Sequence, residues 1–515
     1  MKEITITPRE YQQTIFETCK HNNCLVILPT GTGKTLIALM LAIERFKLYP
    51  LEKVVLLAPT KPLVEQHFKT FQNQLPEDWA DIQIFTGKTP ATQRKKIWQT
   101  AEFIFSTPQC ISNDLKNNLY DLSEVSLLIE DECHRCLKNY AYNLIAKKYS
   151  EQAEHPRVLG LTASPGADKK TITKVCENLG IDAVEIRTRE SKDVKPYLQE
   201  LEFQKIELDF PPQFEEIRQL LKQIYDKKVG ELKSRKVLFG FGSKTTLLET
   251  QRKIMRAITS GTKSINMFVS ASVCAQAIKI SHAMELLETQ TLDSFIKYMK
   301  KIFQEAEQKK SKASQRLAKD IGFNKAYTLA TTINFEHPKI DKLTELAKLQ
   351  IQNNPKAKII IFAQFRDTVN KIKQQLEKIP KLKPTTFIGQ AKKGTGKTAT
   401  GLNQKQQKEI IEKFSQGKFN ILIATSIGEE GLDIPEVSEV IFYEPIPSAI
   451  RSIQRRGRTA RLAPGSLKIL ITKNTRDQAY HYASQAKEKR MHKAIDDIKN
   501  KLGSNLNNNQ QQKLS

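Results

Sequence analysis

The 515-residue sequence has few cysteines, only two tryptophans and no long uncharged apolar run. A helix that crosses a bilayer needs about 18 such residues in succession, and the opening "MKEITITPRE" lacks the apolar core of a secretion signal. The seven cysteines are odd in number and scattered, unlike the disulfide framework of a small secreted protein. We therefore expect a soluble, intracellular (cytoplasmic) protein with reduced thiols and no membrane partner.

Acidic residues are also in short supply. Asp and Glu together number 56 against 82 Lys and Arg, so the formal net charge is +26. A balance this basic points to a polyanionic partner, most often nucleic acid. The alternative is a lysine-rich surface of the kind that thermophilic proteins use.

The order of apolar runs predicts the domain organisation. Short β-branched runs alternate with amphipathic segments from about 24 to 161 and again from about 358, which is typical of βαβ units and a parallel sheet. Apolar residues recur at helical spacing between about 205 and 335. The end is rich in Asn, Gln and Lys and predicts disorder. We therefore expect an α/β fold divided at 1–204, 205–335, 336–490 and 491–515, with the helical part as an insertion between two α/β domains.

A glycine-rich loop follows the first apolar run, in "CLVILPTGTGKTLIALMLAIERF". Glycines let successive N–H groups face a phosphate, a lysine adds charge for the β and γ phosphates of ATP, and a threonine can bind Mg²⁺. Leu28 stands where the strict pattern has glycine, but the strand–loop–helix context still predicts a nucleotide site. Its candidate residues are Thr30, Gly31, Thr32, Gly33, Lys34 and Thr35.

A second "GTGKT" at 394–398 competes with this loop. Ala391 replaces the first glycine, and polar residues follow where a buried helix should begin. We therefore interpret 391–401 as a basic surface loop rather than a second ATP site.

Two carboxylates follow another apolar run, in "LLIEDECHRC" at 127–136. A buried strand here would deliver Asp131 and Glu132 to the sheet edge where doubly wound folds bind their ligands. Asp131 would hold Mg²⁺ and Glu132 would polarise the attacking water. Cys133 and Cys136 have the spacing of a zinc or redox pair, but no second pair of ligands stands at a matching distance.

With these elements placed, the chain resembles a superfamily 2 helicase, which implies two RecA-like domains. "TPREYQ" looks like the adenine-recognition element, "APTKPLVEQ" like motif Ia, "STPQ" like motif Ib and "LTASP" like motif III. "IIIFAQFRDT", "ATSIGEEGLDIPEV" and "QRRGRTAR" resemble motifs IV, V and VI. An isolated "QRRGRTAR" would be interpreted as a solvated basic helix, but the order of the motifs favours a functional role.

The resemblance assigns roles to individual residues. It implies ATP contacts by Arg9 and Gln12 of the adenine-recognition element and by Gly431 and Asp433 of motif V. The catalytic set it implies is Lys34, Asp131, Glu132, Gln454, Arg458 and Arg461; the arginines carry a permanent planar charge suited to the γ-phosphate in the transition state. The nucleic-acid contacts it implies are Pro59, Thr60, Thr107, Gln109, Gln364, Gly389, Gln390 and Thr425.

Longer stretches, such as "SHAMELLETQTLDSFIKYMKKI", resemble the archaeal Hef family, relatives of the Fanconi anaemia group M and Mph-type DNA translocases. This implies an ATP-dependent DNA helicase or translocase of 3′ to 5′ polarity that acts on forked or branched DNA, both single- and double-stranded, in replication-fork repair. Nothing here resembles the C-terminal nuclease that many Hef proteins carry. "DECH" is also the form of the RIG-I-like sensors, so the alternative is a double-stranded RNA-binding ATPase that clamps without processive unwinding.

Basic side chains in the helical insertion are the last candidates. From 292 to 303 the apolar residues form one stripe, and Lys297, Lys300 and Lys301 lie opposite or beside it. We expect these lysines to bind duplex phosphates, with solvated charge as the alternative.

Overall fold

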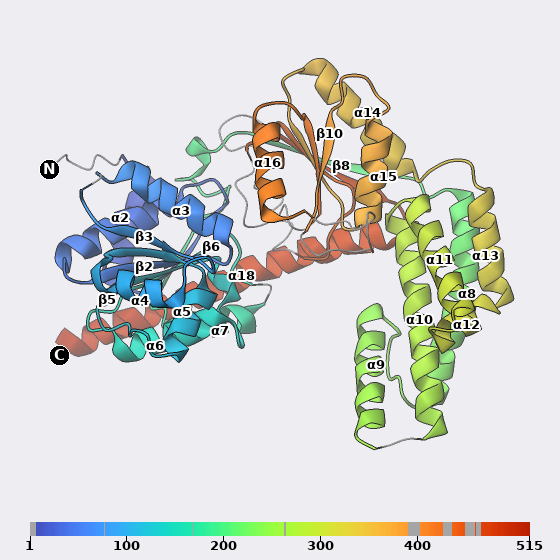
Figure 1. The fold of residues 1–515 in the computed structure, drawn as a ribbon, viewed down its shortest axis with the longest axis horizontal. Helices are drawn as coiled ribbons and strands as arrows, with labels where there is room; N and C mark the ends of the chain where they lie inside the picture. The colour runs from blue at the N-terminus through green and yellow to red at the C-terminus, as the bar shows by residue number, and fades with distance from the viewer. Residues whose placement is uncertain are drawn as a thin grey trace.

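The computed structural model describes residues 7–389 apart from 77, 167, 262 and 263, and also 402–425, 435–448, 459 and 465–514, with side chains as far as 501 except at 404. Two parallel sheets stand apart, a helical insertion extends from the second, and a long helix runs back to the first (Figure 1). The predicted fold class, two parallel-sheet domains with a helical domain inserted between them in the sequence, is confirmed. None of the described helices is long and apolar enough to cross a membrane.

The first sheet has the order β3-β4-β2-β5-β6-β1-β7, and every pairing is parallel. Its strands are β1 Cys24–Ile27, β2 Lys53–Leu57, β3 Ile82–Phe85, β4 Phe103–Ser106, β5 Val125–Asp131, β6 Val158–Thr162 and β7 Ala183–Ile186. The helices that cover it are α1 Glu10–His21, α2 Lys34–Leu48, α3 Lys61–Gln74, α4 Ala91–Thr100, α5 Pro108–Lys116, α6 Ala141–Gln152 and α7 Lys169–Leu179.

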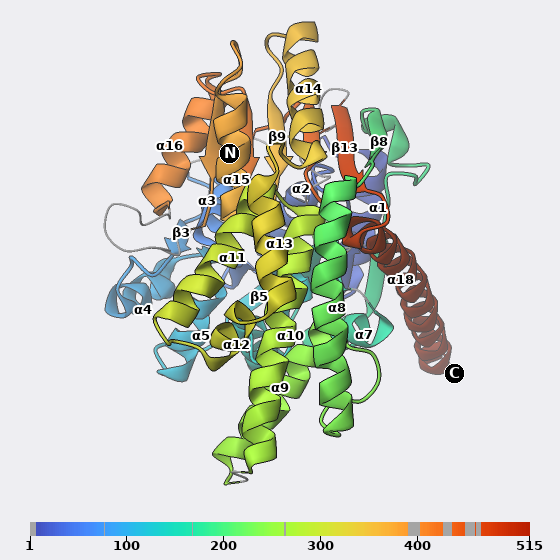
Figure 2. The same cartoon turned by 90° about the vertical axis from the view of Figure 1, so that its right-hand side faces the viewer.

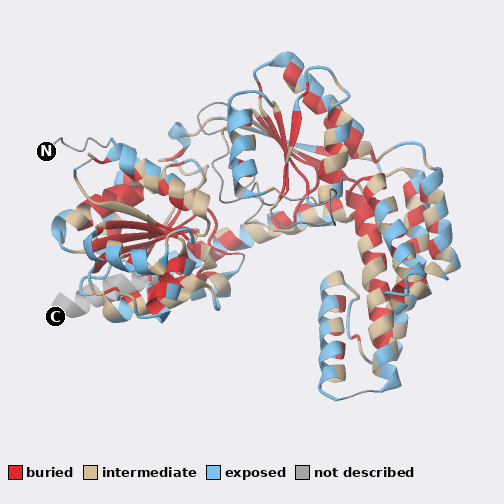
Figure 3. Cartoon of the chain, viewed as in Figure 1, coloured by how far each residue is buried: buried red, intermediate tan, exposed pale blue. Residues whose placement is uncertain are grey.

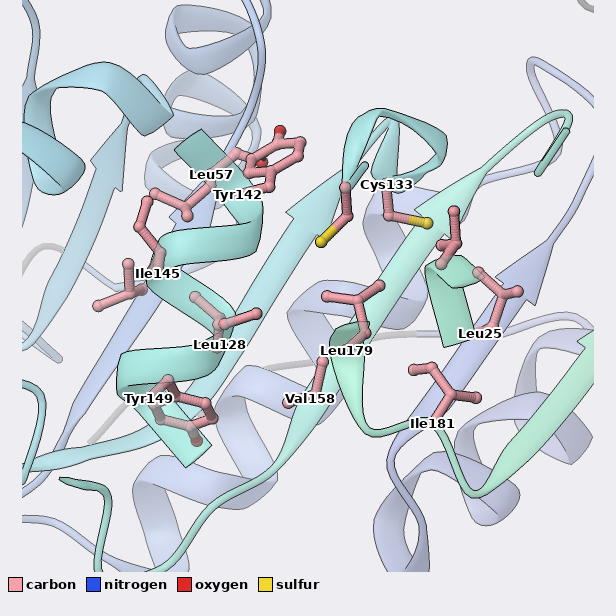
Figure 4. Packing of buried hydrophobic residues seen from close by; sticks show 14 of the residues in the cluster. Leu25, Leu57, Leu128, Cys133, Tyr142, Ile145, Tyr149, Val158, Leu179 and Ile181 are labelled. Atoms are coloured by element: carbon pink, nitrogen blue, oxygen red, sulfur yellow. Dashed lines mark hydrogen bonds between the residues drawn. The ribbon is translucent and has the colours of Figure 1, made fainter. Parts of the chain in front are cut away.

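Apolar side chains fill both faces of this sheet, so its central strands are continuously buried (Figure 3). Figure 4 shows one face, where Leu128 and Val158 of the sheet meet Tyr149 of α6 and Leu179 of α7. Cys133 is part of this core. All seven cysteines are buried and unpaired.

The second sheet has the order β10-β11-β9-β12-β13-β8 and is also parallel. Its strands are β8 Leu201–Leu208, β9 Ile359–Phe362, β10 Pro384–Phe387, β11 Ile421–Ala424, β12 Glu439–Phe442 and β13 Gly465–Thr472. Described helices beside it are α14 Pro338–Asn353, α15 Arg366–Leu376 and α16 Gln404–Ser415.

The expected boundary at 204 falls inside β8, which pairs with β13 along its whole length. The second domain therefore takes up chain from 201, before the insertion begins. Most of β8 is exposed or half-buried because it is an edge strand. It has no continuous apolar run, which is why the pattern of the sequence does not reveal it.

The insertion is helical, as expected. It contains α8 Pro212–Ser234, α9 Lys244–Thr259, α10 Ile265–Thr289, α11 Leu292–Glu307, α12 Lys312–Ala318 and α13 Ile321–Thr332. Side-chain oxygens cap five of these helices at their first turns, at Ser243, Ser264, Thr291, Ser311 and Asp320. The α9 end of the insertion projects away from both sheets (Figures 1 and 2).

The expectation of a disordered tail over 491–515 is wrong. Helix α18 runs from Arg476 to Leu514 and crosses from the second sheet to the first domain. Four of its apolar side chains join the core of the first domain: Met491, Ala494, Ile495 and Ile498. Their helical spacing supplies the buried stripe that the Asn- and Gln-rich composition conceals.

Candidate active site and nucleic-acid interface

The phosphate loop connects β1 to α2 and depends on two glycines with positive φ. Gly31 has φ of +85° and Gly33 has φ of +83°, a region that favours glycine. A Cβ on Gly33 would lie 2.3 Å from Nε2 of Gln12, so a larger residue would displace this side chain from the loop. Helix α2 begins at Lys34, directly after this turn. Its N-terminus and the loop N–H groups together form the kind of cradle that binds phosphate.

The first helix braces this loop. Tyr11 Oη and Gln12 Nε2 both donate to the carbonyl oxygen of Thr32, at 2.6 and 3.1 Å. Gln12 Oε1 accepts from the backbone N–H of Arg9 at 2.9 Å. Arg9 also lies over the ring of Tyr197, 5.0 Å from its centroid. The structure thus places Gln12 against the loop and Arg9 beside it.

Lys34 folds back over the loop. Its Nζ donates to the carbonyl oxygens of Leu28 and Pro29, at 2.9 and 3.3 Å. Its charge also acts on Asp131, at the end of β5. The lysine is therefore placed where its charge can act on a phosphate and on the acidic pair, Asp131 and Glu132.

Asp131 is buried and held by a histidine. Its Oδ2 lies 2.9 Å from Nε2 of His67, and Nδ1 of the same ring lies 3.5 Å from Oγ1 of Thr35. Burial alone would raise the pKa of Asp131, but the contact with His67 and the charge of Lys34 bring that pKa below its ordinary value. Asp131 is therefore an anion linked to Thr35 through the ring of His67, and a carboxylate and a hydroxyl are oxygen ligands that suit a divalent cation.

Glu132 starts a chain of polar contacts that leads to the next strand. It adopts the left-handed conformation with φ of +51°, and its Oε2 lies 3.3 Å from Nδ1 of His134. The same nitrogen is 3.2 Å from Oγ1 of Thr162, which accepts from the N–H of Ser164 at 3.0 Å. Ser164 donates in turn to Sδ of Met491 in α18 at 3.0 Å. The acidic pair, the "LTASP" stretch and α18 are therefore physically connected.

Candidate nucleic-acid residues of the first domain follow two neighbouring strands. Pro59 and Thr60 lie between β2 and α3, and Thr107 and Gln109 lie where β4 leads into α5. Gln109 is exposed, while the other three are half-buried. The N-termini of α3 and α5 therefore meet at one edge of the sheet, and both carry a partial positive charge.

The second domain repeats this arrangement. Gln364, Gly389 and Thr425 follow β9, β10 and β11, three adjacent strands that run in the same direction. Arg366 Nη2 donates to the carbonyl oxygen of Gly389 at 3.0 Å. Gln364 is exposed, Gly389 half-buried and Thr425 buried. The structure brings these three candidates to one sheet edge.

Several sequence-predicted positions lie outside the described residues. They are the loop 391–401 and the residues Gln390, Gly431, Asp433, Gln454, Arg458 and Arg461. Their roles stay predictions.

The insertion lysines share an outer surface of α11. Lys297, Lys300 and Lys301 are all exposed. Lys297 pairs with Asp293 one turn away, at 2.6 Å. This placement leaves the three ammonium groups accessible to phosphates.

Sequence reasoning missed two supports of the acidic pair. His67 lies in α3, directly after the motif Ia stretch, and nothing in its spacing indicates a contact with β5. Tyr142 donates from Oη to the carbonyl oxygens of Asp131 and Leu57, at 2.7 and 3.2 Å. Both contacts join segments distant in the chain, so only the fold reveals them.

Three family profiles match successive parts of the chain. Residues 9–172 match the DEAD/DEAH box helicase family and 338–463 match the helicase conserved C-terminal domain. Residues 213–337 match a helical-bundle family named for an ATP-dependent RNA helicase. The divisions follow the first sheet, the second sheet and the insertion.

Individual relatives span nearly the whole chain. An ATP-dependent DNA helicase mph1 of Neurospora crassa is 33% identical over 92% of this chain and 42% of its own length. The mouse Fanconi anemia group M protein homolog is 31% identical over 95% of this chain and 26% of its own length. A Methanocaldococcus jannaschii protein named as an ATP-dependent RNA helicase is 37% identical over 96% of this chain and 61% of its own length. The chain thus spans less than two thirds of these curated relatives.

A solved structure also matches over most of both chains. The crystal structure of the Pyrococcus furiosus Hef helicase domain has a TM-score of 0.70 and 42% identity, over 93% of this chain and 98% of that one. Matches to the DEAD/DEAH box and C-terminal helicase families accompany it. The chain therefore belongs to the ATP-hydrolysing superfamily 2 helicases, in the Hef and Fanconi anaemia group M branch.

Proposed function

We propose that this chain is an ATP-driven DNA helicase or translocase that acts on forked or branched DNA with 3′ to 5′ polarity. The observation that carries the proposal is the shared location of the candidates. Pro59, Thr60 and Thr107 follow strands of the first sheet, and Gln364, Gly389 and Thr425 follow strands of the second, always at the carboxyl ends. Two such edges, one beside a phosphate loop, suit a motor that grips one strand with two domains.

The chemistry follows from the residues around the phosphate loop. Lys34 would contact the β and γ phosphates of ATP, and Glu132 would orient and polarise the attacking water. Thr35 and Asp131 would hold Mg²⁺, which when bound neutralises phosphate charge. His67 would keep Asp131 anionic and in place. Gln454, Arg458 and Arg461 would complete the site from the second domain on closure, with Gly431 and Asp433 near the nucleotide, as the family resemblance implies.

DNA is favoured over RNA by the branch to which the chain belongs. The Neurospora crassa relative is named as a DNA helicase, and the mouse relative is a Fanconi anemia group M protein homolog. This also supports a role in replication-fork repair. Single-stranded and double-stranded arms would both be partners, with the insertion lysines on a duplex arm.

The second candidate is a double-stranded RNA-binding ATPase that clamps without processive unwinding. "DECH" and the RNA helicase names of the insertion family and the Methanocaldococcus jannaschii protein favour it. Cys133, however, is fully buried, and a Cβ on Gly160 would lie 3.1 Å from its sulfur. The thiol fills the core next to Leu25 and Leu179, as Figure 4 shows. This position therefore reports packing and carries little information about the nucleic acid.

The test is ATPase stimulation by two matched ligands. A forked DNA and a duplex RNA of corresponding sequence are titrated into the protein at fixed ATP and Mg²⁺. The proposal expects strong stimulation by the fork and weak stimulation by the RNA duplex. Stronger stimulation by the RNA duplex would contradict the DNA motor and support the double-stranded RNA-binding ATPase.

A further inference from the structure

The loop between α8 and α9 presents two aromatic rings to solvent. Phe239 is 78% exposed and Phe241 is 91% exposed. The loop belongs to the α9 end of the insertion, which projects away from both sheets (Figures 1 and 2). A single exposed apolar side chain needs no explanation, but this short loop exposes two large rings only two positions apart.

The backbone that carries these rings is anchored. Leu238, beside the first ring, is buried in the core that α8, α9 and α10 share. Tyr225 Oη donates to the carbonyl oxygen of Gly242, and Thr246 Oγ1 donates to that of Phe241 at 2.7 Å. The rings are therefore displayed by a held loop, which lowers the entropy cost of binding a ligand.

The loop contains two glycines, Gly240 and Gly242, and a close contact with α8 explains the second of them. A Cβ on Gly242 would lie 2.8 Å from Cγ1 of Val229 in α8. The chain passes so close to α8 that only glycine fits there. The close approach leaves the preceding ring on the outer side of the loop, where its exposure is greatest.

The segment of the chain that carries the rings is rich in basic residues. Between 226 and 261, acidic side chains occur only at Asp226, Glu231 and Glu249. Arg235 and Lys244 pair with Glu231 and Glu285. The other basic side chains of this segment make no ion pair within the part of the chain that the structure describes: Lys227, Lys228, Lys233, Lys236, Arg252, Lys253 and Arg256.

We propose that Phe239 and Phe241 stack on unpaired bases at the branch point of the nucleic acid, while the surrounding basic side chains hold its phosphates. Aromatic rings next to basic groups bind single strands without sequence preference, because every base has a flat face. A continuous duplex offers no such face along its length. The rings would therefore give the insertion a preference for junctions with unpaired nucleotides. The inference rests on the proposed function, since it assumes a branched substrate.

The basic surroundings favour this occupant over a protein partner. A polyanion gains from every unpaired lysine and arginine near the loop. An apolar protein surface would have to bury some of the same charges, at a cost in free energy. Protein docking is therefore the alternative that the experiment must separate.

The experiment compares two DNA ligands and three double variants of the full chain. The ligands are a fork with unpaired nucleotides at its branch and a continuous duplex of equal length, both followed by fluorescence anisotropy. F239A/F241A should weaken fork binding by between about fivefold and about a hundredfold, and leave duplex binding unchanged. F239L/F241L should behave like the alanine variant, because leucine keeps apolarity but cannot stack. F239W/F241W should retain the parent affinity.

Controls separate the inference from folding and from the proposed function. L51A/I321A removes two side chains that are 91% and 86% exposed, and it should bind both ligands like the parent. Thermal unfolding should be unchanged in all variants, because the rings contribute little to the core. Fork binding by the alanine variant at parent strength, or rescue by leucine, would overturn base stacking and favour a protein-docking surface. If the parent bound neither DNA, the proposed function would fail and the inference with it.

Discussion

The phosphate-loop region and the insertion use polar side chains in opposite ways. Around the loop, functional groups contact buried partners, as Asp131 contacts His67 and Thr32 contacts Gln12. On α11 the three lysines are exposed, and of these three only Lys297 forms an ion pair within the described part of the chain. Buried partners fix the charge state and position of a group, which chemistry requires. Exposed charges fix neither, but they suffice for a ligand recognised by its phosphate backbone.

The largest effects should come from breaking the chemistry. Lys34→Ala should weaken nucleotide binding and lower ATPase turnover by orders of magnitude, because it removes the phosphate charge. Glu132→Gln should keep ATP bound but lose hydrolysis, because it spares the cradle. Nucleotide binding and turnover would be measured separately, with Lys47→Ala on the exposed end of α2 as a control. Normal turnover by Glu132→Gln would show that another group activates the water.

The next effect sharpens the role of buried partners. His67→Ala should lower ATPase activity by about tenfold to a hundredfold, as is typical for a group that orients a metal ligand. Burial raises the pKa of Asp131 and His67 lowers it, so the variant should have a higher Asp131 pKa. The activity that needs the anion is present above that pKa and is lost as pH falls through it.

A pH profile tests this directly. The acid limb of the ATPase should lie at higher pH in His67→Ala than in the parent, where Asp131 titrates below the ordinary carboxyl value of about 3.9. The exposed His21 at the end of α1, changed to alanine, should leave the profile in place. An unchanged acid limb in His67→Ala would remove His67 from the site.

The insertion should show a smaller and salt-dependent effect. Changing Lys297, Lys300 and Lys301 to alanine should weaken fork binding and reduce its salt slope by about 0.9 for each phosphate that is no longer neutralised. The ATPase stimulated by plain single strands should largely survive. A matched variant removes Lys147, Lys170 and Lys174, which are exposed in or beside α6 and α7. Equal salt slopes in the parent and the α11 variant would show that these lysines do not bind phosphates.

The smallest effect concerns the second "GTGKT". Shortening the loop between Lys392 and Thr400 should leave ATPase turnover nearly unchanged, since surface loops tolerate such changes. Lys397→Ala should leave nucleotide affinity unchanged. A loss of affinity with Lys34 intact would make this loop part of an ATP site.

The same contrast explains how far the sequence could predict the structure. Buried strands such as β1 and β5 can be recognised in the sequence as apolar runs. Parallel topology then brings the carboxyl ends of β1, β5 and β6 to one edge of the sheet. The edge strand β8 has no such run. The end of helix α18 was not predicted because its four buried apolar residues are separated by polar ones, although they pack into the core of the first domain.

The sequence did not reveal the role of His67 for a related reason. Glycines and carboxylates at strand ends have a spacing that the chemistry imposes, so Lys34 and Asp131 could be named. His67 acts only because α3 packs beside β5, and its position depends on three-dimensional contact rather than on spacing. Nothing in a local pattern encodes such a contact.

The most direct test of the motor is strand separation on a fork. A forked DNA with a 3′ single-stranded arm is incubated with ATP and Mg²⁺, and displaced strand is followed against time for the parent and Glu132→Gln. We predict ATP-dependent displacement by the parent, none by the variant, and little on a fork with only a 5′ arm. A parent protein that hydrolyses ATP on the fork but never separates its strands would contradict the motor and establish a clamp.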